Sequence, residues 1–373
     1  MSCPRSKFNA SQNGAALVVA MLVFALVAAL MVGLQRDFSL SLQRGTNQVL
    51  SEQAWAYLIG AEGLAALALQ ADSREDARAK EPSDNLNELW AQPPTPYPLD
   101  AGGWLNGAIE DLQGRLNLNL LPEANAALQS NPGGAESTDS EGAAEDLASR
   151  ADVSADAPML SSDDMKRWTA PQKVLIRLLQ SLDDASLSLE EAMALTDAIT
   201  DFIDRDAERR VSGAEEAEYR YADYPYLPAN RALASVSELR AVQGMTEPIY
   251  VALAPLVTVW PEAGGRLNIL TSPLPVLRAL NGDDQMLPLP KMEVERLDML
   301  RREGAITSVS DLLADPVFEG QQLAQLEPLL DIRSDWFLLD ATVELVERKR
   351  HLFSVLHRMP ERTVAVFRSE GEL

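Results

Sequence analysis

An uncharged, strongly apolar run from Ala15 to Leu34 constrains this chain more than any other feature. As an α-helix, about 20 residues at ~1.5 Å each span roughly 30 Å, which matches the hydrocarbon core of a bilayer. Arg5 and Lys7 precede the run, and positive charges favour the cytoplasmic side of a membrane. The sequence therefore predicts one membrane-spanning helix, with its N-terminus in the cytoplasm and the bulk of the chain on the other side.

The run differs from a cleaved secretory signal, whose apolar core ends after roughly 7–15 residues at an Ala-x-Ala-like site. This run is longer and is followed by residues 35–38 (Gln-Arg-Asp-Phe), which offer no such site. No proline occurs between Ala15 and Gln70, and apolar or small residues recur at steps of four and three. We therefore predict one helix from about Ala15 to Gln70 with one apolar face in its second half. The residues expected on that face are Leu50, Ala54, Tyr57, Ala61, Leu64 and Ala68.

The composition excludes several classes of function. The chain has 32 Lys and Arg against 56 Asp and Glu, a formal net charge of −24. Nucleic-acid binding needs clustered cations, and the densest basic patch is the short segment 347–351. Cys3, the one cysteine, precedes the apolar run, and His351 and His357 lie in no metal-binding pattern. We therefore predict that the chain binds no nucleic acid and is not an enzyme.

Segments with strand character lie on both sides of the middle of the chain. Residues 102–121 alternate apolar and polar side chains around a turn at Gln113 and Gly114, and residues 335–369 are rich in β-branched and aromatic side chains. Residues 129–158 are instead rich in Ala, Ser, Asp, Glu and Gly and almost lack large apolar side chains. Such a composition buries too little surface to offset the entropy of ordering, so we expect a disordered insertion there.

From about residue 162 to 328 the pattern is helical, and Ser188 with Glu191 predicts a capping box at one helix start. This region also partly repeats itself. SVSEL at 235–239 recurs as SVSDL at 308–312, and LAPL at 253–256 recurs as LEPL at 326–329. Both pairs are 73 residues apart. GRLN likewise begins at Gly114 and at Gly265. We therefore predict two related helical units.

An acidic stretch from Asp201 to Arg231 is the candidate for metal chemistry. Its carboxylates at positions 204, 206, 208 and 215 match positions 1, 3, 5 and 12 of an EF-hand calcium loop, but position 6 is Arg209 instead of glycine. Crowded carboxylates repel one another without a cation, which favours an irregular calcium loop. The alternative is a solvated acidic loop with tyrosines packed beneath it. The expected calcium ligands are Asp204, Asp206, Glu215 and Glu216.

The N-terminus resembles that of type IV pilin-like proteins, because a short basic leader ends in Gly14 and an apolar helix starts at Ala15. The resemblance implies that a prepilin peptidase cuts between these two residues and that Ala15 is N-methylated. Most such proteins have glutamate at the fifth mature position, which is Val19 here. A buried carboxylate is costly without a cationic partner, so a subunit with Val19 needs no such partner. Among the pseudopilins of type II secretion, this absence is the mark of the minor pseudopilin K family (general secretion pathway protein K), which the chain resembles.

This resemblance implies an α+β fold, in which a pilin-like domain (a long N-terminal helix packed on an antiparallel sheet) carries a large inserted α-helical domain. The expected domains are a basic leader at 1–14, a transmembrane helix at 15–34, pilin-like parts at 35–121 and 329–373, and the helical insertion at 122–328. The stretch 213–239 also resembles the region in which relatives bind calcium.

The implied function is that of a minor pseudopilin at the tip of the periplasmic pseudopilus, which primes assembly and supports protein export across the outer membrane. The implied location is the inner membrane, with the bulk of the chain in the periplasm. The implied partners are the minor pseudopilins I and J, the prepilin peptidase, the inner-membrane assembly platform and the lipid bilayer.

Two alternatives remain at this point. A signal-anchored periplasmic metal-dependent hydrolase would use the acidic loop, although no nucleophile or general-base pattern accompanies it. A DNA-uptake pseudopilin would bind DNA. Residues 266–280 resemble the opening of a helix-hairpin-helix unit, but they lack its glycine–hydrophobe–glycine hairpin.

We expect membrane-extracted protein to begin at Ala15 when a prepilin peptidase is co-expressed, and to keep its leader when the peptidase is absent. The measurement is the intact mass together with the N-terminal residue. A terminus at Met1 or Ser2 in both samples would contradict the pilin-like assignment and leave a simple anchored protein.

Overall fold

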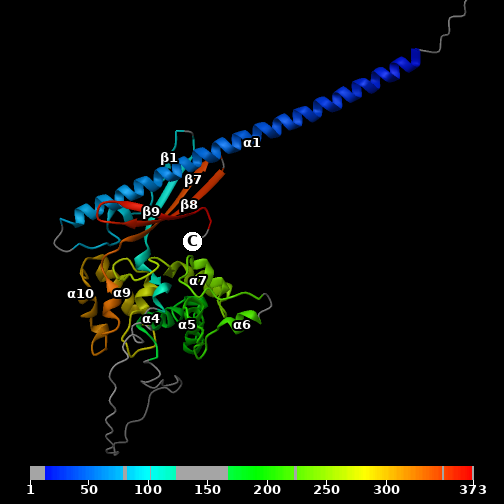
Figure 1. Cartoon of the computed structure of the whole chain (residues 1–373). Helices are drawn as coiled ribbons and strands as arrows, with labels where there is room; N and C mark the ends of the chain where they lie inside the picture. Colours follow the sequence, from blue (N-terminus) through cyan, green and yellow to red (C-terminus); the bar gives the residue numbers. More distant parts are fainter. Residues whose placement is uncertain are drawn as a thin grey trace, which may run out of the picture.

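The computed structural model describes residues 13–78, 82–100, 102–122, 167–221, 225–346 and 348–371. Most of the predicted leader and the whole of the predicted disordered insertion at 129–158 lie outside these ranges. Within them, a long helix α1 (Asn13–Asp76) runs along one side of an antiparallel sheet, and a group of short helices lies beyond the sheet (Figure 1). This arrangement confirms the predicted fold class.

Helix α1 has 64 residues without a break, which confirms the single long helix predicted from the sequence. At ~1.5 Å per residue it is about 96 Å long. The side chains from Gly14 to Thr46 are all exposed, and the most apolar part of the helix has a mean hydropathy of 3.0. By length and composition, this half of α1 is suited to cross a membrane.

The buried face of the second half of α1 is rotated relative to the prediction. Two of the expected residues, Ala54 and Ala61, are buried, but Leu64 is 65% exposed. The buried stripe consists of Ala54, Leu58, Ala61, Ala65 and Leu69, at steps of four, three, four and four. The sequence could not decide between the two stripes, because α1 carries apolar residues on more than one face.

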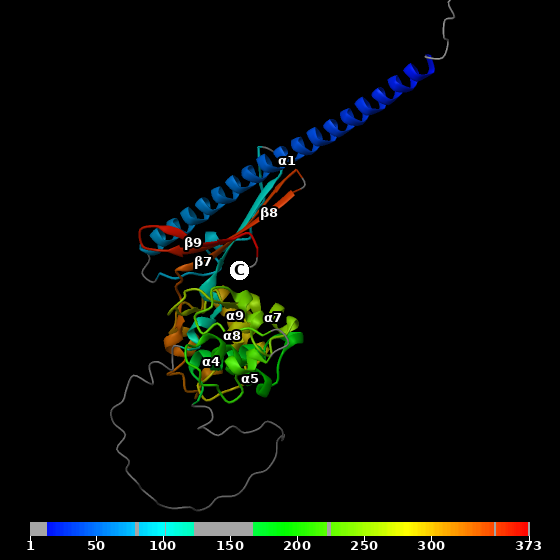
Figure 2. The same cartoon turned by 45° about the vertical axis from the view of Figure 1, so that its right-hand side comes forward.

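The sheet has the order β1-β2-β7-β8-β9 and is antiparallel throughout. Its strands are β1 (Tyr97–Pro98), β2 (Trp104–Asp111), β7 (Trp336–Leu345), β8 (Arg348–Arg358) and β9 (Thr363–Ser369). Alternate residues of β7, including Phe337, Leu339 and Val343, belong to the core shared with α1. The three C-terminal strands predicted from the sequence are thereby confirmed, and Figure 2 shows them between α1 and the short helices.

The helical part is inserted between β2 and β7. Its helices are α4 (Ala170–Leu179), α5 (Leu189–Ile203), α6 (Glu216–Arg220), α7 (Glu247–Leu253), α8 (Leu274–Ala279), α9 (Lys291–Arg302) and α10 (Val309–Leu313). They surround one continuous apolar core, which also takes in Leu116, Leu118 and Leu121. Residues 116–121, assigned from the sequence to the pilin-like part, thus pack with the helices.

Short 3₁₀ turns connect these elements. They are η1 (Leu89–Ala91), η2 (Leu112–Gly114), η3 (Leu118–Leu120), η4 (Asp183–Ala185), η5 (Val236–Ala241), η6 (Ala254–Leu256), η7 (Pro316–Phe318) and η8 (Glu327–Leu329). The predicted capping box also forms at the start of α5, where the Glu191 N–H donates to Ser188 Oγ (3.3 Å) and the Ser188 N–H donates to Glu191 Oε2 (3.0 Å).

The predicted internal repeat corresponds to two similar structural units. Each contains a short parallel strand pair that starts with a Leu-Asn strand: β3 (Leu116–Asn117) with β4 (Val257–Thr258), and β5 (Leu267–Asn268) with β6 (Leu330–Asp331). In both units the asparagine Oδ1 accepts a hydrogen bond from the backbone two residues later, at 3.0 Å for Asn117 and 2.9 Å for Asn268. The repeated GRLN motif therefore builds the same strand-and-turn twice.

A buried polar network joins the pilin-like part to the helical part. Asp111, at the end of β2, accepts hydrogen bonds from Asn268 Nδ2 (3.0 Å), Thr271 Oγ1 (2.6 Å) and Ser334 Oγ (2.6 Å). Burial raises the pKa of Asp111 to about 6, although the hydrogen bonds from Ser334 and Thr271 oppose this shift. The three donors come from both sides of the junction, so Asp111 ties the sheet to the insertion.

Arg358 on β8 extends this network to α1. Its Nη2 donates to Asp84 (2.6 Å) and its Nη1 donates to Asp72 Oδ2 (2.8 Å) in the last turns of α1. Arg358 is 4% exposed and Asp84 is fully buried. Burial and the neighbouring Asp84 carboxylate raise the pKa of Asp72 to about 6, although Arg358 lowers it. Arg358 therefore supplies the cation for two carboxylates.

We expect Arg358→Met to lower the free energy of unfolding by about 3 kcal/mol or more near pH 8, because two carboxylates would lose their buried cation. A carboxylate with a raised folded-state pKa binds protons more tightly in the folded state, so it costs stability as the pH rises. Without the guanidinium the pKa of Asp72 should rise above its present value of about 6. The loss of unfolding free energy in Arg358→Met should therefore become smaller as the pH falls from about 7 to 5.

Thermal unfolding across this pH range measures the effect, and Arg362→Met, at an exposed position in the same hairpin, is the matched control. A deficit that is independent of pH, or equal in both variants, would contradict the role assigned to Arg358.

Candidate functional site

The acidic loop follows α5 and brings three of the four predicted ligands together. One carboxylate oxygen from each of Asp204, Asp206 and Glu215 lies within 4.8 Å of the others. Asp204 occupies the C-cap position of α5, and Glu215 occupies the N-cap position of α6. The fourth, Glu216, is exposed and forms an ion pair with Arg220 on the next turn of α6.

The clustered carboxylates carry buried oxygens that are not satisfied by hydrogen bonds. Asp204 Oδ1 and both oxygens of Glu215 are buried and accept no hydrogen bond from the described groups. Burial, reinforced by neighbouring carboxylates, raises the pKa of Asp204 to about 6 and of Glu215 to about 7. Buried oxygens without donors are costly, and a cation that coordinates them would remove the cost. The donor set is all oxygen, which suits a hard divalent cation.

Asp201 lies beside this cluster, and the loop spacing did not single it out. It lies on α5, is fully buried, and its Oδ1 accepts no hydrogen bond from the described groups. Burial raises its pKa to about 7, and the Asp204 carboxylate contributes. The loop packs tightly against it, because a Cβ at Gly213 would lie 1.9 Å from Asp201 Oδ2. The signal was present in the sequence, since Asp197, Asp201 and Asp204 follow the helical spacing of one face.

Three of the four carboxylates at EF-hand positions, those of residues 204, 206 and 215, lie in the cluster. Glu208, at position 5, is exposed and does not belong to the carboxylate cluster. Its backbone N–H donates to Asp206 Oδ1 (2.9 Å), which orders the turn. Arg209, at the position where an EF-hand has glycine, pairs with Glu218 at 2.7 Å. The loop therefore gathers its carboxylates by a different backbone path.

The predicted processing residues lie at the free end of α1. Gly14 and Ala15 are helical and exposed, and Val19 is 61% exposed.

Further along α1, Leu64 and Leu67 are 65% and 68% exposed on the side of the helix that faces away from the sheet. Gly60 and Gly63 lie beside them, and a Cβ at either glycine would meet no atom within 4 Å. This stretch is called the outer face of α1 below.

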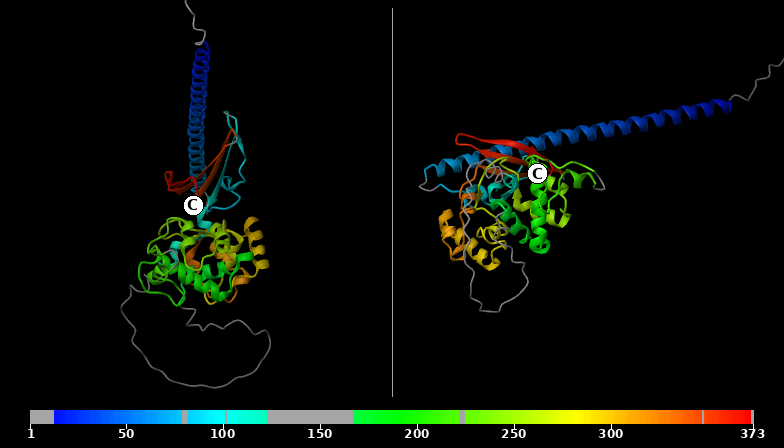
Figure 3. Two further views of the ribbon diagram at one scale, coloured as in Figure 1. Left: turned by 90° about the vertical axis from the view of Figure 1, so that its right-hand side faces the viewer. Right: turned by 60° about the horizontal axis from the view of Figure 1, so that its bottom comes forward.

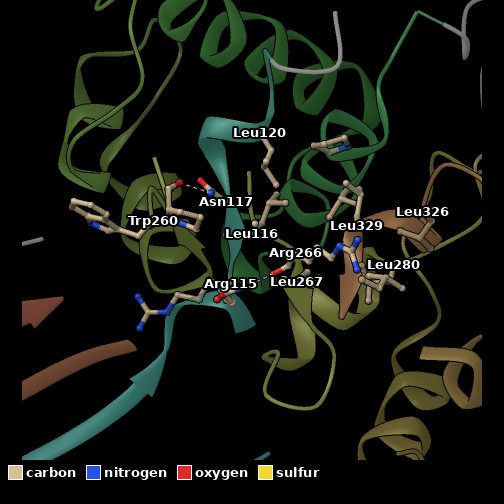
Figure 4. A pocket seen from close by; sticks show the side chains of 16 residues that line it. Arg115, Leu116, Asn117, Leu120, Trp260, Arg266, Leu267, Leu280, Leu326 and Leu329 are labelled. Carbon is tan, nitrogen blue, oxygen red and sulfur yellow. Dashed lines mark hydrogen bonds between the residues drawn. The ribbon is translucent and has the colours of Figure 1, made fainter. Parts of the chain in front are cut away.

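A separate, narrow pocket lies between α4, β3 and the β5–β6 pair (Figure 4). Leucines dominate its lining, which also includes Arg115 and Arg266. Arg115 pairs with Glu110, and Arg266 pairs with Asp331. Among the described residues that line it, none is a carboxylate, histidine, cysteine, serine or threonine. The pocket therefore offers no acid, base or nucleophile for the hydrolase alternative.

Comparison with known proteins identifies the family. The sequence model of the family described as "Type II secretion system (T2SS), protein K" matches residues 114–262. The type II secretion system protein K of Pseudomonas aeruginosa is 31% identical over 351 residues, which covers 93% of this chain and 89% of that protein. The chain belongs to the type II secretion system protein K family. The Aeromonas hydrophila protein K is 27% identical over 369 residues, with 96% of both chains covered.

A solved structure supports the same family. A chain of the GspK-GspI-GspJ complex from the type 2 secretion system of enterotoxigenic Escherichia coli matches with a TM-score of 0.64 and 25% identity. The match covers 88% of this chain and all of that one. This protein K family member is therefore a minor pseudopilin of the type II secretion system, and the comparisons do not favour the hydrolase or the DNA-uptake alternative. Its relatives are named as components of a secretion system.

Proposed function

We propose that this minor pseudopilin occupies the tip of the periplasmic pseudopilus, primes its assembly and so supports protein export across the outer membrane. The observation that carries the proposal is the place of the helical part, which lies at the end of the molecule remote from the start of α1 (Figure 3). In a filament whose subunits stack through α1, a body of this width would crowd a subunit placed above it. Val19 supports the same position, because a subunit without the usual glutamate needs no partner amine above it.

We propose that the prepilin peptidase removes the leader between Gly14 and Ala15, with N-methylation of Ala15, before the subunit joins the assembly platform. The mature helix then spans the inner membrane with its N-terminus in the cytoplasm and the sheet and helical part in the periplasm. The uniformly exposed, apolar first half of α1 and the basic residues Arg5 and Lys7 support this orientation. We assign the protein an assembly role and no catalytic one.

We propose the minor pseudopilins I and J as partners, since the related solved structure is a complex of GspK with GspI and GspJ. The outer face of α1 suits such a contact. Leu64 and Leu67 are exposed apolar side chains, and Gly60 and Gly63 allow another helix to approach the backbone closely. A partner helix on this face would bury both leucines.

We expect the double substitution Leu64→Asp with Leu67→Asp to weaken co-purification with I and J at least tenfold, or about 1.4 kcal/mol, because carboxylates would be buried in an apolar contact. Co-expression of the processed full chain with both partners, followed by affinity capture and size-exclusion chromatography, measures the loss. Met299→Asp on α9 is the control, because Met299 is 62% exposed and lies away from α1.

An intact complex with the double variant would contradict the proposed contact. Crosslinks that place the protein along the shaft, with subunits both above and below it, would contradict the tip position itself.

We propose further that the acidic loop binds calcium through Asp204, Asp206 and Glu215, with Asp201 behind them. The buried oxygens without hydrogen-bond donors support this proposal, and the all-oxygen donor set favours calcium over softer metals. Glu216 remains a candidate ligand only if the start of α6 rearranges, because its carboxylate pairs with Arg220. When bound, the cation would neutralise the carboxylates and hold the loop against α5.

We expect calcium to raise the unfolding midpoint of the full chain in detergent, by the equivalent of about 2.7 kcal/mol at a hundredfold excess over Kd. Glu215→Gln should abolish most of this gain, because it removes a buried ligand. Glu208→Gln, an exposed carboxylate of the same loop outside the cluster, should keep the gain. Equal calcium responses in the two variants would contradict the proposed ligands.

A further inference from the structure

Arg210 places a cation of the protein itself against the carboxylates of the candidate metal site. Its Nε lies 3.2 Å from Asp201 Oδ1, and its Nη2 lies 3.5 Å from Asp204 Oδ2. Its backbone N–H also donates to Asp201 Oδ2 (3.0 Å), so the start of the side chain is anchored. The guanidinium and a metal ion would therefore compete for the carboxylates of Asp201 and Asp204.

The contacts of the Arg210 guanidinium are poor. Charge-assisted N–H···O hydrogen bonds are usually about 2.7–2.9 Å long, and Arg358 reaches Asp84 and Asp72 at 2.6 and 2.8 Å in the same protein. Arg210 Nε and Asp201 Oδ1 are instead both buried and make no hydrogen bond with the described groups, although they lie 3.2 Å apart. The guanidinium donates a long hydrogen bond from Nη2 to Asp204 Oδ2 (3.5 Å), so its displacement breaks one weak hydrogen bond.

The charge balance favours exchange for a divalent ion. The carboxylates of Asp201, Asp204, Asp206 and Glu215 lie near one another, and the Arg210 guanidinium contacts two of them; together the five groups carry a formal charge of −3 when all are ionised. A monovalent ion in place of the Arg210 guanidinium would leave the net charge of the cluster unchanged. A divalent ion brings one more positive charge and can coordinate several oxygens at once. A divalent ion and the guanidinium repel each other at these distances, so both cannot remain in contact with the same oxygens.

We propose that Arg210 is an internal competitor for the divalent cation: binding of the ion displaces its guanidinium from Asp201 and Asp204 towards solvent and releases Asp201 Oδ1 as an additional ligand. The side chain of Arg210 is 19% exposed, so a path to solvent is open. Competition with a bound cation of the protein makes the site selective for divalent over monovalent ions. This inference rests on the proposed calcium site.

The test is calcium titration by isothermal calorimetry on the processed full chain in detergent, for the unmodified protein, Arg210→Gln and Arg209→Gln. Removal of the competitor should tighten calcium binding about tenfold in Arg210→Gln and lower the stability of this variant in chelator. Arg209→Gln is the matched control, because Arg209 pairs with Glu218 and contacts none of the four carboxylates. Its affinity should stay within about twofold of the unmodified protein.

A second readout needs no substitution. Modification of Arg210 by phenylglyoxal, followed by mass spectrometry of its peptide, should speed up several-fold when calcium is added and should not respond to sodium. Measurable calcium binding with equal or weaker affinity in Arg210→Gln, or calcium-independent reactivity of Arg210, would overturn the competitor role alone. Flat titrations for all three proteins would overturn the calcium site itself.

Discussion

The antiparallel pairing of β2 with β7 is the contact on which the rest of the structure depends. The two strands lie far apart in the sequence, and their register joins Trp104 to Glu344 and Asp111 to Phe337. Because the strands are antiparallel neighbours, the chain leaves the sheet after β2 and returns to it before β7 at the same end. The whole helical part is thereby held at two adjacent points. The same register turns alternate side chains of β7 towards α1 and so builds the pilin-like core.

Buried carboxylates are satisfied by hydrogen bonds at the junction between the sheet and the helical part, but not in the acidic loop. At the junction, Arg358 meets Asp84 and Asp72 at 2.6 and 2.8 Å, and the hydroxyl and amide donors around Asp111 complete the network. That cluster contains its own cation and is a structural connection between two parts of the molecule. In the acidic loop, buried oxygens lack donors, and Arg210 Nε forms no hydrogen bond with Asp201 Oδ1 although it lies 3.2 Å away. The difference in hydrogen bonding is what separates a structural cluster from a candidate cation site.

The candidate site could be predicted in part. Asp204, Asp206 and Glu215 are close in sequence, so the spacing of one loop was enough to group them, and the structure brings them together. Glu216 was grouped with them for the same reason, but its place on α6 pairs its carboxylate with Arg220 one turn later. Asp201 and Arg210 were not recognised as contributors, because their roles depend on how the loop folds back over α5. The rotation of the buried face of α1 has a similar origin, since Leu58 and Leu69 are selected by the sheet that covers them.

The sequence by itself determined the features that depend on local chemistry. An uninterrupted apolar run without proline begins α1, and β-branched and aromatic residues make the C-terminal strands. Ser188 with Glu191 caps α5, and the repeated GRLN motif makes two similar turns. Only the tertiary structure decided which face of α1 is buried, that Arg358 serves Asp72 and Asp84, and that Arg210 lies against Asp201. Those contacts join residues from separate elements, and their energies depend on burial and distance, which no local pattern of residues encodes.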